Sequence, residues 1–317
     1  MKKSNKPIPS HITDYLDWID VEKGLSSKTQ ENYARFLNRF IEWLEKNDLS
    51  DLCPHELSPD HVWKYRIYLA RQTTSKHSSK TLSRSTQNSY LIALRTFFAY
   101  FASRDIQAMP PEKIELPKDK GDPEVQFLDL GQLKRLFKVP DTTKIKGLRD
   151  RAILETLFST GMRVSELVAL DRDQIELSLG EDYLELGIVG KGNKARTVYF
   201  SPRAMKWIGN YLEKRDDDSK ALFANLRKRS DASRRLTVRS IENIVKKSAL
   251  KAGLPSNITP HVLRHSFATN LLNKGVDLRT VQEFLGHKSI TATQIYTHVT
   301  NKKLKDVHRK FHGGDLE

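Results

Sequence analysis

Disulfide bonds and membrane spans are the first features that this sequence excludes. The chain has 317 residues and a single cysteine, Cys53, so it cannot form an intramolecular disulfide, which is typical of proteins from a reducing compartment. No apolar run of about 18 residues occurs, and the basic start of the chain lacks the apolar stretch of a signal peptide. We therefore expect a cytoplasmic protein that does not bind a membrane.

Acidic residues are scarce in two long stretches of the chain. Residues 61–104 contain eight lysines or arginines and no aspartate or glutamate, and residues 226–251 contain nine basic residues against two acidic ones. The formal net charge of the whole chain is +15, which indicates a polyanionic partner such as a nucleic acid. Each stretch alone could be a solvated loop. Two such stretches in different halves of the chain favour a clamp around DNA.

Patterns that bind metals are also missing. His261 and His265 stand four residues apart, a spacing that can chelate zinc, but no glutamate lies between them. Arg264, which is next to this pair, would repel a cation. The carboxylate cluster that two-metal nuclease chemistry needs does not stand out either. The sequence therefore predicts a protein without a metal or another cofactor.

Two segments near the start of the chain are similar to each other. Residues 25–44 and 82–101 both open with the pattern L-S-x-x-T-Q-x-x-Y and carry apolar residues at helical spacing. Shorter helices are expected at residues 12–21 and 59–70. The hydroxyl and basic residues at the two helix starts sit where backbone N–H groups attract phosphate, although helix capping alone also explains the serines. We expect a helical domain over residues 8–110 that is a candidate for DNA binding.

A proline-rich, charged segment follows this domain. Residues 109–127 hold four prolines and show no periodic pattern, which is typical of a linker. We place this linker at residues 111–124 and a second domain at residues 125–317.

The second domain is predicted to be mostly helical with a small antiparallel sheet. Helices are expected at residues 129–137 and 145–159. The strand-like segments 182–189 and 195–201 are joined by the turn sequence GKGNK at residues 190–194, and further helices follow. The chain is therefore expected to be mainly α.

Four motifs of the second domain carry cations and proton donors. A phosphodiester is an anion, so its cleavage needs a nucleophile, cations on the non-bridging oxygens and an acid for the leaving oxygen. Arginine suits these oxygens because its planar fork can bond two of them and keeps its charge. The motifs are STGMRVSEL with Arg163 and Glu166, VGKGNKAR with Lys191, TPHVLRHSFAT with His261 and Arg264, and LGHKSITATQIYTHV with His287 and Tyr296.

In this order and spacing, the four motifs resemble the conserved boxes of the tyrosine recombinase, or phage integrase, family. The resemblance is strongest to the Xer-type site-specific recombinases and covers nearly the whole chain. It implies a SAM-like core-binding domain ahead of the catalytic domain, a C-shaped clamp on duplex DNA, and strand cleavage and rejoining through a 3′-phosphotyrosyl intermediate. It also implies nucleoid association, dimers on inverted half-sites, and a tetrameric synapse of this protein or with a paralogous recombinase.

The resemblance also implies a role for each motif residue. Tyr296 would be the nucleophile, Arg163 and Arg264 would bind the non-bridging oxygens, and Lys191 would be the general acid, with Lys194 as its alternative. His261 would accept or relay the tyrosine proton, His287 would donate a hydrogen bond to the phosphate, and Glu166 would orient Arg163 or His261. His265 is expected to face elsewhere. Taken singly, the Arg163–Glu166 pair could be a surface ion pair and residues 190–194 a plain polar turn.

The spacing in the last motif predicts an interruption of the helix between His287 and Tyr296. His287 and Tyr296 are nine residues apart and would point to opposite sides of one continuous helix. Gly286 is suited to end a helix, and Ser289 or Thr291 could cap a new short helix that carries Tyr296.

Eight basic residues are candidates for phosphate contacts outside the catalytic set. They are Lys28, Lys76, Lys80, Arg84, Lys194, Arg234, Arg235 and Arg239. Two other functions remain possible from the sequence: a non-catalytic DNA-binding regulator of the same fold, and a type IB topoisomerase-like relaxase.

Overall fold

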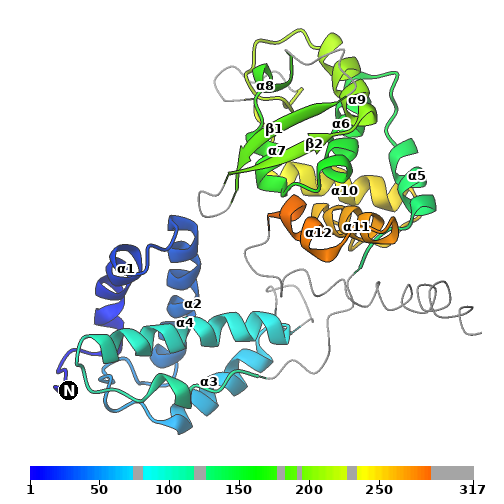
Figure 1. The fold of residues 1–317 in the computed structure, drawn as a ribbon. Helices are drawn as coiled ribbons and strands as arrows, with labels where there is room; N and C mark the ends of the chain where they lie inside the picture. Colours follow the sequence, from blue (N-terminus) through cyan, green and yellow to red (C-terminus); the bar gives the residue numbers. More distant parts are fainter. Residues whose placement is uncertain (74–80, 118–125, 177–182, 191–194, 227–233, 287–317) are drawn as a thin grey trace, which may run out of the picture. The chain divides into compact units, whose positions relative to one another are not determined.

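The computed structural model describes residues 1–73, 81–117, 126–176, 183–190, 195–226 and 234–286. The chain divides into two compact units, Met1–Asp122 and Pro123–Glu317, which we describe separately (Figure 1). Within the described residues, no helix is long and apolar enough to cross a membrane. Four of the candidate phosphate-binding and catalytic lysines, namely Lys76, Lys80, Lys191 and Lys194, lie outside the described residues, as do His287 and Tyr296.

The first unit is a helical bundle with an aromatic core. Tyr15, Phe40, Tyr65 and Phe97 are fully buried there, and their rings contact one another edge to face, as in the Phe40–Tyr65 and Tyr15–Phe97 pairs. The elements are the short 3-10 helices Ile8–His11 and Pro111–Lys113 and the α-helices α1 (Ile12–Val21), α2 (Ser27–Glu45), α3 (Pro59–Arg71) and α4 (Arg84–Ser103). The four predicted helices are therefore confirmed, with shifts of at most two residues at their ends.

The second unit is built around one central helix, α6 (Ile145–Thr160). Its side chains are buried on almost every face, because α9, α11 and the sheet pack against it. The remaining elements are α5 (Leu130–Lys138), α7 (Val164–Ala169), α8 (Asp173–Glu176), β1 (Leu184–Val189), β2 (Ala195–Phe200), α9 (Pro202–Glu213), α10 (Val238–Lys251), α11 (Pro260–Asn273) and α12 (Leu278–Leu285). The mostly α architecture with a small sheet is as predicted.

The sheet is an antiparallel pair of strands, as predicted. Leu184 pairs with Phe200 and Val189 pairs with Ala195, and residues 191–194 of the predicted turn lie outside the described residues. Val198 and Phe200 are buried. Side chains alternate along a strand, so Arg196 lies on this same buried face of β2.

Two helices that border the candidate site end at glycines in the left-handed conformation. Gly161 (φ 58°) follows α6, and Gly286 (φ 62°) follows α12. The predicted helix end at Gly286 is confirmed. Space also requires glycine at position 161, because a Cβ atom there would stand 2.4 Å from Cδ1 of Phe267.

Gly161→Ala should therefore destabilise the protein more than the same substitution at a glycine that has positive φ but open space around it. The backbone strain costs about 1–2 kcal/mol, and the clash with Phe267 adds about 1–3 kcal/mol of overpacking. Gly253→Ala is the matched control, since Gly253 has φ +68° but nothing within 4 Å of the added Cβ. Urea unfolding of both variants measures the difference, and equal losses of free energy would contradict the role of Phe267.

Candidate active site

Arg163 and Glu166 meet at the start of α7. Arg163 is the residue that precedes the helix, with an extended backbone (φ −72°, ψ 149°). Its backbone N–H donates to Oε2 of Glu166 at 2.7 Å, and its guanidinium Nη1 donates to Oε1 at 2.9 Å. The two residues therefore meet through a capping turn, and not along one face of a helix as their spacing suggests. The Glu166 side chain is only 5% exposed, so this is no surface ion pair.

A second arginine, Arg196 on β2, holds the same carboxylate. Its Nη1 donates to Oε1 of Glu166 at 2.8 Å and its Nη2 donates to Oε2 at 2.7 Å. This bidentate geometry is the strong form of an arginine–carboxylate pair. Arg196 belongs to the motif VGKGNKAR but was not among the predicted site residues. The signal that could have found it is its place on the buried face of a strand, since a cation there requires an anion nearby.

The two arginines keep Glu166 ionised. Burial by itself would raise the pKa of this carboxyl, but the hydrogen bonds from Arg196 and from the backbone of Arg163 outweigh burial and lower the pKa to about 2. Glu166 is therefore negatively charged throughout the physiological range and cannot act as a proton donor there.

Arg264 joins the carboxyl ends of two helices. It projects from α11 and is 2% exposed. Its Nη1 donates to the carbonyl of Gly161 after α6, and its Nη2 donates to the carbonyl of Leu285 at the end of α12, both at 2.6 Å. Helix carboxyl ends carry partial negative charge and unpaired carbonyls, so they can accommodate a buried guanidinium.

The same helix end brings Arg163 beside Arg264. Nη2 of Arg163 is 3.4 Å from the carbonyl oxygen of Gly286, which follows the carbonyl of Leu285 that Arg264 binds. Two guanidinium groups from separate motifs thus meet at consecutive carbonyls. Figure 1 shows α11 and α12 packed together in the second unit. The end of α12 is also where the chain continues to residue 287.

His261 lies in the first turn of α11, three residues before Arg264. Partial burial of the ring lowers its pKa, and the positive charges of Arg264 and Arg163 lower it further. The neutral form, which can accept a proton, is therefore favoured at pH 7. The ring of His265 packs edge to face against His261, with centroids 4.3 Å apart. His265 was expected to face elsewhere; instead, the i, i+4 spacing on the helix places it against the candidate site residue.

The predicted catalytic and supporting residues divide into two groups. Lys191, His287 and Tyr296 lie outside the described residues. Arg163, Glu166, His261 and Arg264 are described and belong to one region of the second unit, as the contacts above show. Among the described residues, no group of three or more histidine, cysteine, aspartate or glutamate side chains is arranged to hold a metal ion.

The described candidates for phosphate contacts differ in their exposure and in the partners they have within the protein. Lys28 and Arg239 sit in exposed pairs with glutamates of their own helices, and the Arg239 side chain is 80% exposed. Arg84 is the first residue of α4, and Arg234 is half-buried. Arg235 instead donates to the carbonyls of Val168 and Leu170 and pairs with Asp171. Arg235 therefore stabilises the end of α7 through hydrogen bonds within the protein.

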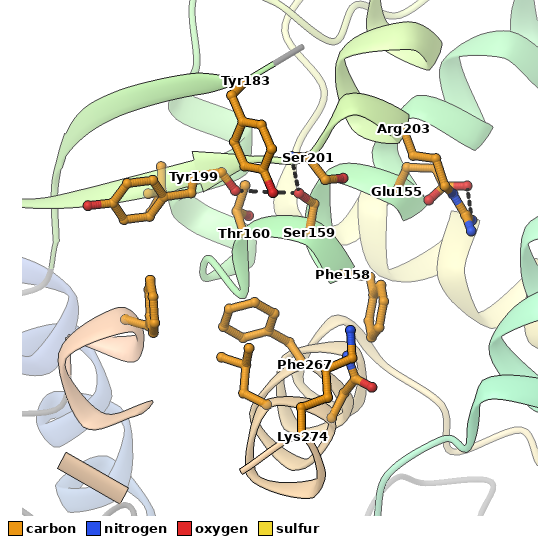
Figure 2. A pocket seen from close by; sticks show the side chains of 14 residues that line it. Glu155, Phe158, Ser159, Thr160, Tyr183, Tyr199, Ser201, Arg203, Phe267 and Lys274 are labelled. Atoms are coloured by element: carbon orange, nitrogen blue, oxygen red, sulfur yellow. Dashed lines mark hydrogen bonds and ion pairs between the residues drawn. The ribbon is translucent and has the colours of Figure 1, made fainter. Parts of the chain in front are cut away.

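A pocket of about 480 Å³ lies elsewhere in the second unit (Figure 2). Its lining comes from α6, the sheet, α9, α11 and α12 and includes the aromatic residues Phe158, Tyr199, Phe267 and Phe284. A pair between Arg203 and the buried Glu155, 2.6 Å apart, stands at its edge. Of the predicted catalytic residues that the structure describes, namely Arg163, His261 and Arg264, none lines this pocket.

Glu166→Gln should cost about 3 kcal/mol of unfolding free energy at pH 7, because it leaves two arginines facing each other without their anion. The folded pKa of about 2 is below the unfolded value of about 4.3, so the carboxylate stabilises the fold fully above that unfolded value. The loss caused by the variant should therefore shrink as the pH falls from about 4.3 towards 2.

Urea unfolding across this pH range measures the effect. Glu185→Gln, which removes an exposed carboxylate of β1, is the control and should change the free energy little at any pH. A Glu166→Gln loss that stays constant down to pH 2 would refute the depressed pKa.

Comparison with known proteins agrees with this arrangement. The profile of the Phage integrase family matches residues 126–303, and that of the phage integrase N-terminal SAM-like domain matches residues 12–108. The tyrosine recombinase XerD of Lacticaseibacillus casei is 36% identical over 308 residues, covering 95% of this chain and 98% of the relative. The tyrosine recombinase XerC of Pelotomaculum thermopropionicum is 37% identical over 318 residues, covering 95% and 97%.

Solved structures share the fold. The XerH site-specific recombinase bound to palindromic difH substrate, in a post-cleavage complex, superposes with a TM-score of 0.72 at 22% identity, covering 97% of this chain and 98% of that one. A lambda integrase dimer bound to a COC′ core site gives a TM-score of 0.66 at 15% identity, covering 92% and 77%. The matches of both domain profiles and of the full-length relatives establish that the chain belongs to the phage integrase family of tyrosine recombinases.

Proposed function

We propose that this protein is a site-specific DNA recombinase that cleaves and rejoins DNA strands through a covalent link to Tyr296. The observation that carries the proposal is the meeting of Arg163 and Arg264 at the end of α12, in a family member whose four motifs are all intact. A non-catalytic DNA-binding protein would not need two guanidinium groups from separate motifs at one place.

The two arginines are suited to bind the scissile phosphate. Each guanidinium has five N–H donors, of which the carbonyls of Gly161, Leu285 and Gly286 and the Glu166 carboxylate use some. Because these contacts fix both groups before DNA binds, little reorganisation is needed when negative charge develops on the phosphate oxygens. His287, the next residue after Gly286, is proposed to donate a further hydrogen bond to the phosphate.

Proton transfer is proposed to involve His261, Lys191 and Tyr296. The tyrosine hydroxyl oxygen attacks the phosphorus atom, and its proton passes to His261, whose lowered pKa keeps the ring neutral and ready to accept it. The bond between phosphorus and the 5′ oxygen breaks, and Lys191 supplies a proton to that oxygen. The 3′-phosphotyrosyl link keeps the energy of the phosphodiester, so a 5′-hydroxyl from another strand can reverse the attack without ATP.

Duplex DNA is the proposed substrate, and both units are proposed to contact it. Lys28 and Arg84 of the first unit and Arg239 of α10 are exposed, and the half-buried Arg234 precedes α10. These four residues are candidates for phosphate contacts, together with Lys76, Lys80 and Lys194. Arg235 is left out because its donors are used within the protein. The palindromic substrate of XerH and the dimer of lambda integrase support inverted half-sites and a dimer on each site. A synaptic tetramer, of this protein alone or with a paralogous recombinase, completes the proposal.

Tyr296→Phe should abolish covalent protein–DNA adducts and leave non-covalent binding intact, because only the attacking oxygen is removed. The protein is incubated with fragments of its host genome, and fragments that stay attached under denaturing conditions are sequenced, which also identifies the recombination site. Tyr183→Phe, which alters an exposed tyrosine of the same unit, should keep the adducts. Adducts that persist in Tyr296→Phe would exclude the proposed nucleophile.

DNA binding should weaken steeply as salt rises, because each neutralised phosphate releases counterions. Arg239→Gln should lower the slope of log affinity against log salt concentration by about 1 for a duplex of mixed sequence. Lys144→Gln, an exposed lysine outside both acid-poor stretches, should leave the slope unchanged. Fluorescence anisotropy at several salt concentrations measures both, and a slope near zero for the parent protein would contradict the proposed interface.

A further inference from the structure

Arg196 connects three separate parts of the candidate site. It projects from β2, directly after the residue pair that closes the β1–β2 hairpin, and its side chain is 10% exposed. Its guanidinium grips both oxygens of Glu166. One of these oxygens, Oε1, is the same atom that receives Nη1 of Arg163. The position of the Arg163 guanidinium is therefore set by a carboxylate that Arg196 orients.

The charge balance of this trio explains why two arginines are needed. A buried carboxylate that faced Arg163 alone would neutralise it, and the pair would offer little attraction to a phosphate. Two guanidinium groups around one carboxylate leave one net positive charge next to the carbonyl of Gly286. Arg196 thus allows Glu166 to hold Arg163 in place without cancelling its charge.

The Arg196 side chain also packs against Gly286, through the atoms next to its guanidinium carbon. A Cβ atom at position 286 would stand 2.7 Å from Cδ of Arg196 and 3.2 Å from its Nε. The carbonyl of that same glycine accepts the contact from Arg163. Arg196 is therefore linked to Arg163 in two ways. Both side chains bind the Glu166 carboxylate, and both contact Gly286 at the end of α12.

We propose that Arg196 is a positioning residue for Arg163, acting through Glu166. Its loss would let Glu166 turn towards Arg163 alone, which lowers the positive charge that the phosphate meets and shifts the guanidinium. The proposal rests on the proposed recombinase function, in which Arg163 binds a non-bridging oxygen, and adds to it a residue that acts through Glu166.

The test measures single-turnover DNA cleavage by full-length Arg196→Gln on two substrates. Both are nicked duplexes that carry a site recovered by covalent trapping. One has the natural scissile phosphodiester, and the other has a methylphosphonate, in which a methyl group replaces one non-bridging oxygen and removes the negative charge. A substrate without this charge depends less on arginine, so it reports whether a variant acts through the phosphate-binding groups.

Arg196→Gln should cleave the phosphodiester between about 10-fold and 100-fold more slowly than the parent. Its defect on the methylphosphonate should shrink to a few fold, and Arg163→Gln should show the same pattern. Arg196→Lys keeps the charge but loses the bidentate grip, so its defect should be intermediate. Arg203→Gln, which breaks another arginine–glutamate pair of the same unit, is the matched control and should cleave both substrates at the parent rate.

Two results would overturn the proposal: parent-like cleavage of the phosphodiester by Arg196→Gln, or an equal loss on both substrates, which would mean that Arg196 only supports the fold. Thermal unfolding of the variants, measured alongside, detects a loss of folded protein, and Arg196→Lys then serves as the test variant. Failure of the proposed function would look different, since the parent protein would then form no adduct on either substrate or Tyr296→Phe would still form one.

Discussion

The Arg264 guanidinium lies almost without solvent contact between the carboxyl ends of two helices, and the arrangement of the catalytic unit depends on that contact. α6 and α12 both end at a left-handed glycine, and each presents a carbonyl to this one side chain. A buried cation is costly unless it is well paired, and two helix ends with unpaired carbonyls supply that pairing. The contact joins the central helix of the unit to the segment that leads to residue 287.

Glu166, Arg163 and Arg196 form a second group of charges, in which a buried carboxylate and not a helix end holds the guanidinium groups. Glu166 is buried and ionised, and it orients Arg163 from the protein side. A single ion pair would leave no net charge, so the second arginine on β2 is essential to the electrostatics. In both groups, the protein fixes guanidinium groups with its own acceptors before any ligand binds. Such preorganisation is the main way in which enzymes stabilise developing charge.

The sequence was most informative where the structure depends on local patterns. The helices of the first unit follow from apolar spacing, the hairpin follows from a glycine-rich turn between two strands, and the end of α12 follows from Gly286. Arg163 and Glu166 could be paired because they are close in sequence, although the capping turn that joins them was missed. The roles of Arg163, His261 and Arg264 came from the family resemblance and stay predictions.

Contacts between distant segments were not predictable in the same way. Arg196 pairs with a carboxylate 30 residues away. Its place on the buried face of a strand indicates that it needs an anion, but not which residue supplies it. Arg235 stands in a basic stretch that suggested phosphate binding, yet its acceptors lie more than 60 residues away at the end of α7. Charge patterns show that cations are present, but only the tertiary structure shows which of them are engaged within the protein.

The packing of Arg196 under Gly286 constrains how the two positions can evolve. Any side chain at position 286 would need the space that the Arg196 stem fills, and it would also have to adopt a left-handed backbone. A shorter residue at position 196 would open that space but would give up the grip on Glu166. A side chain at position 286 should therefore be tolerated only together with a shorter residue at position 196, although 90 residues separate the two positions in sequence.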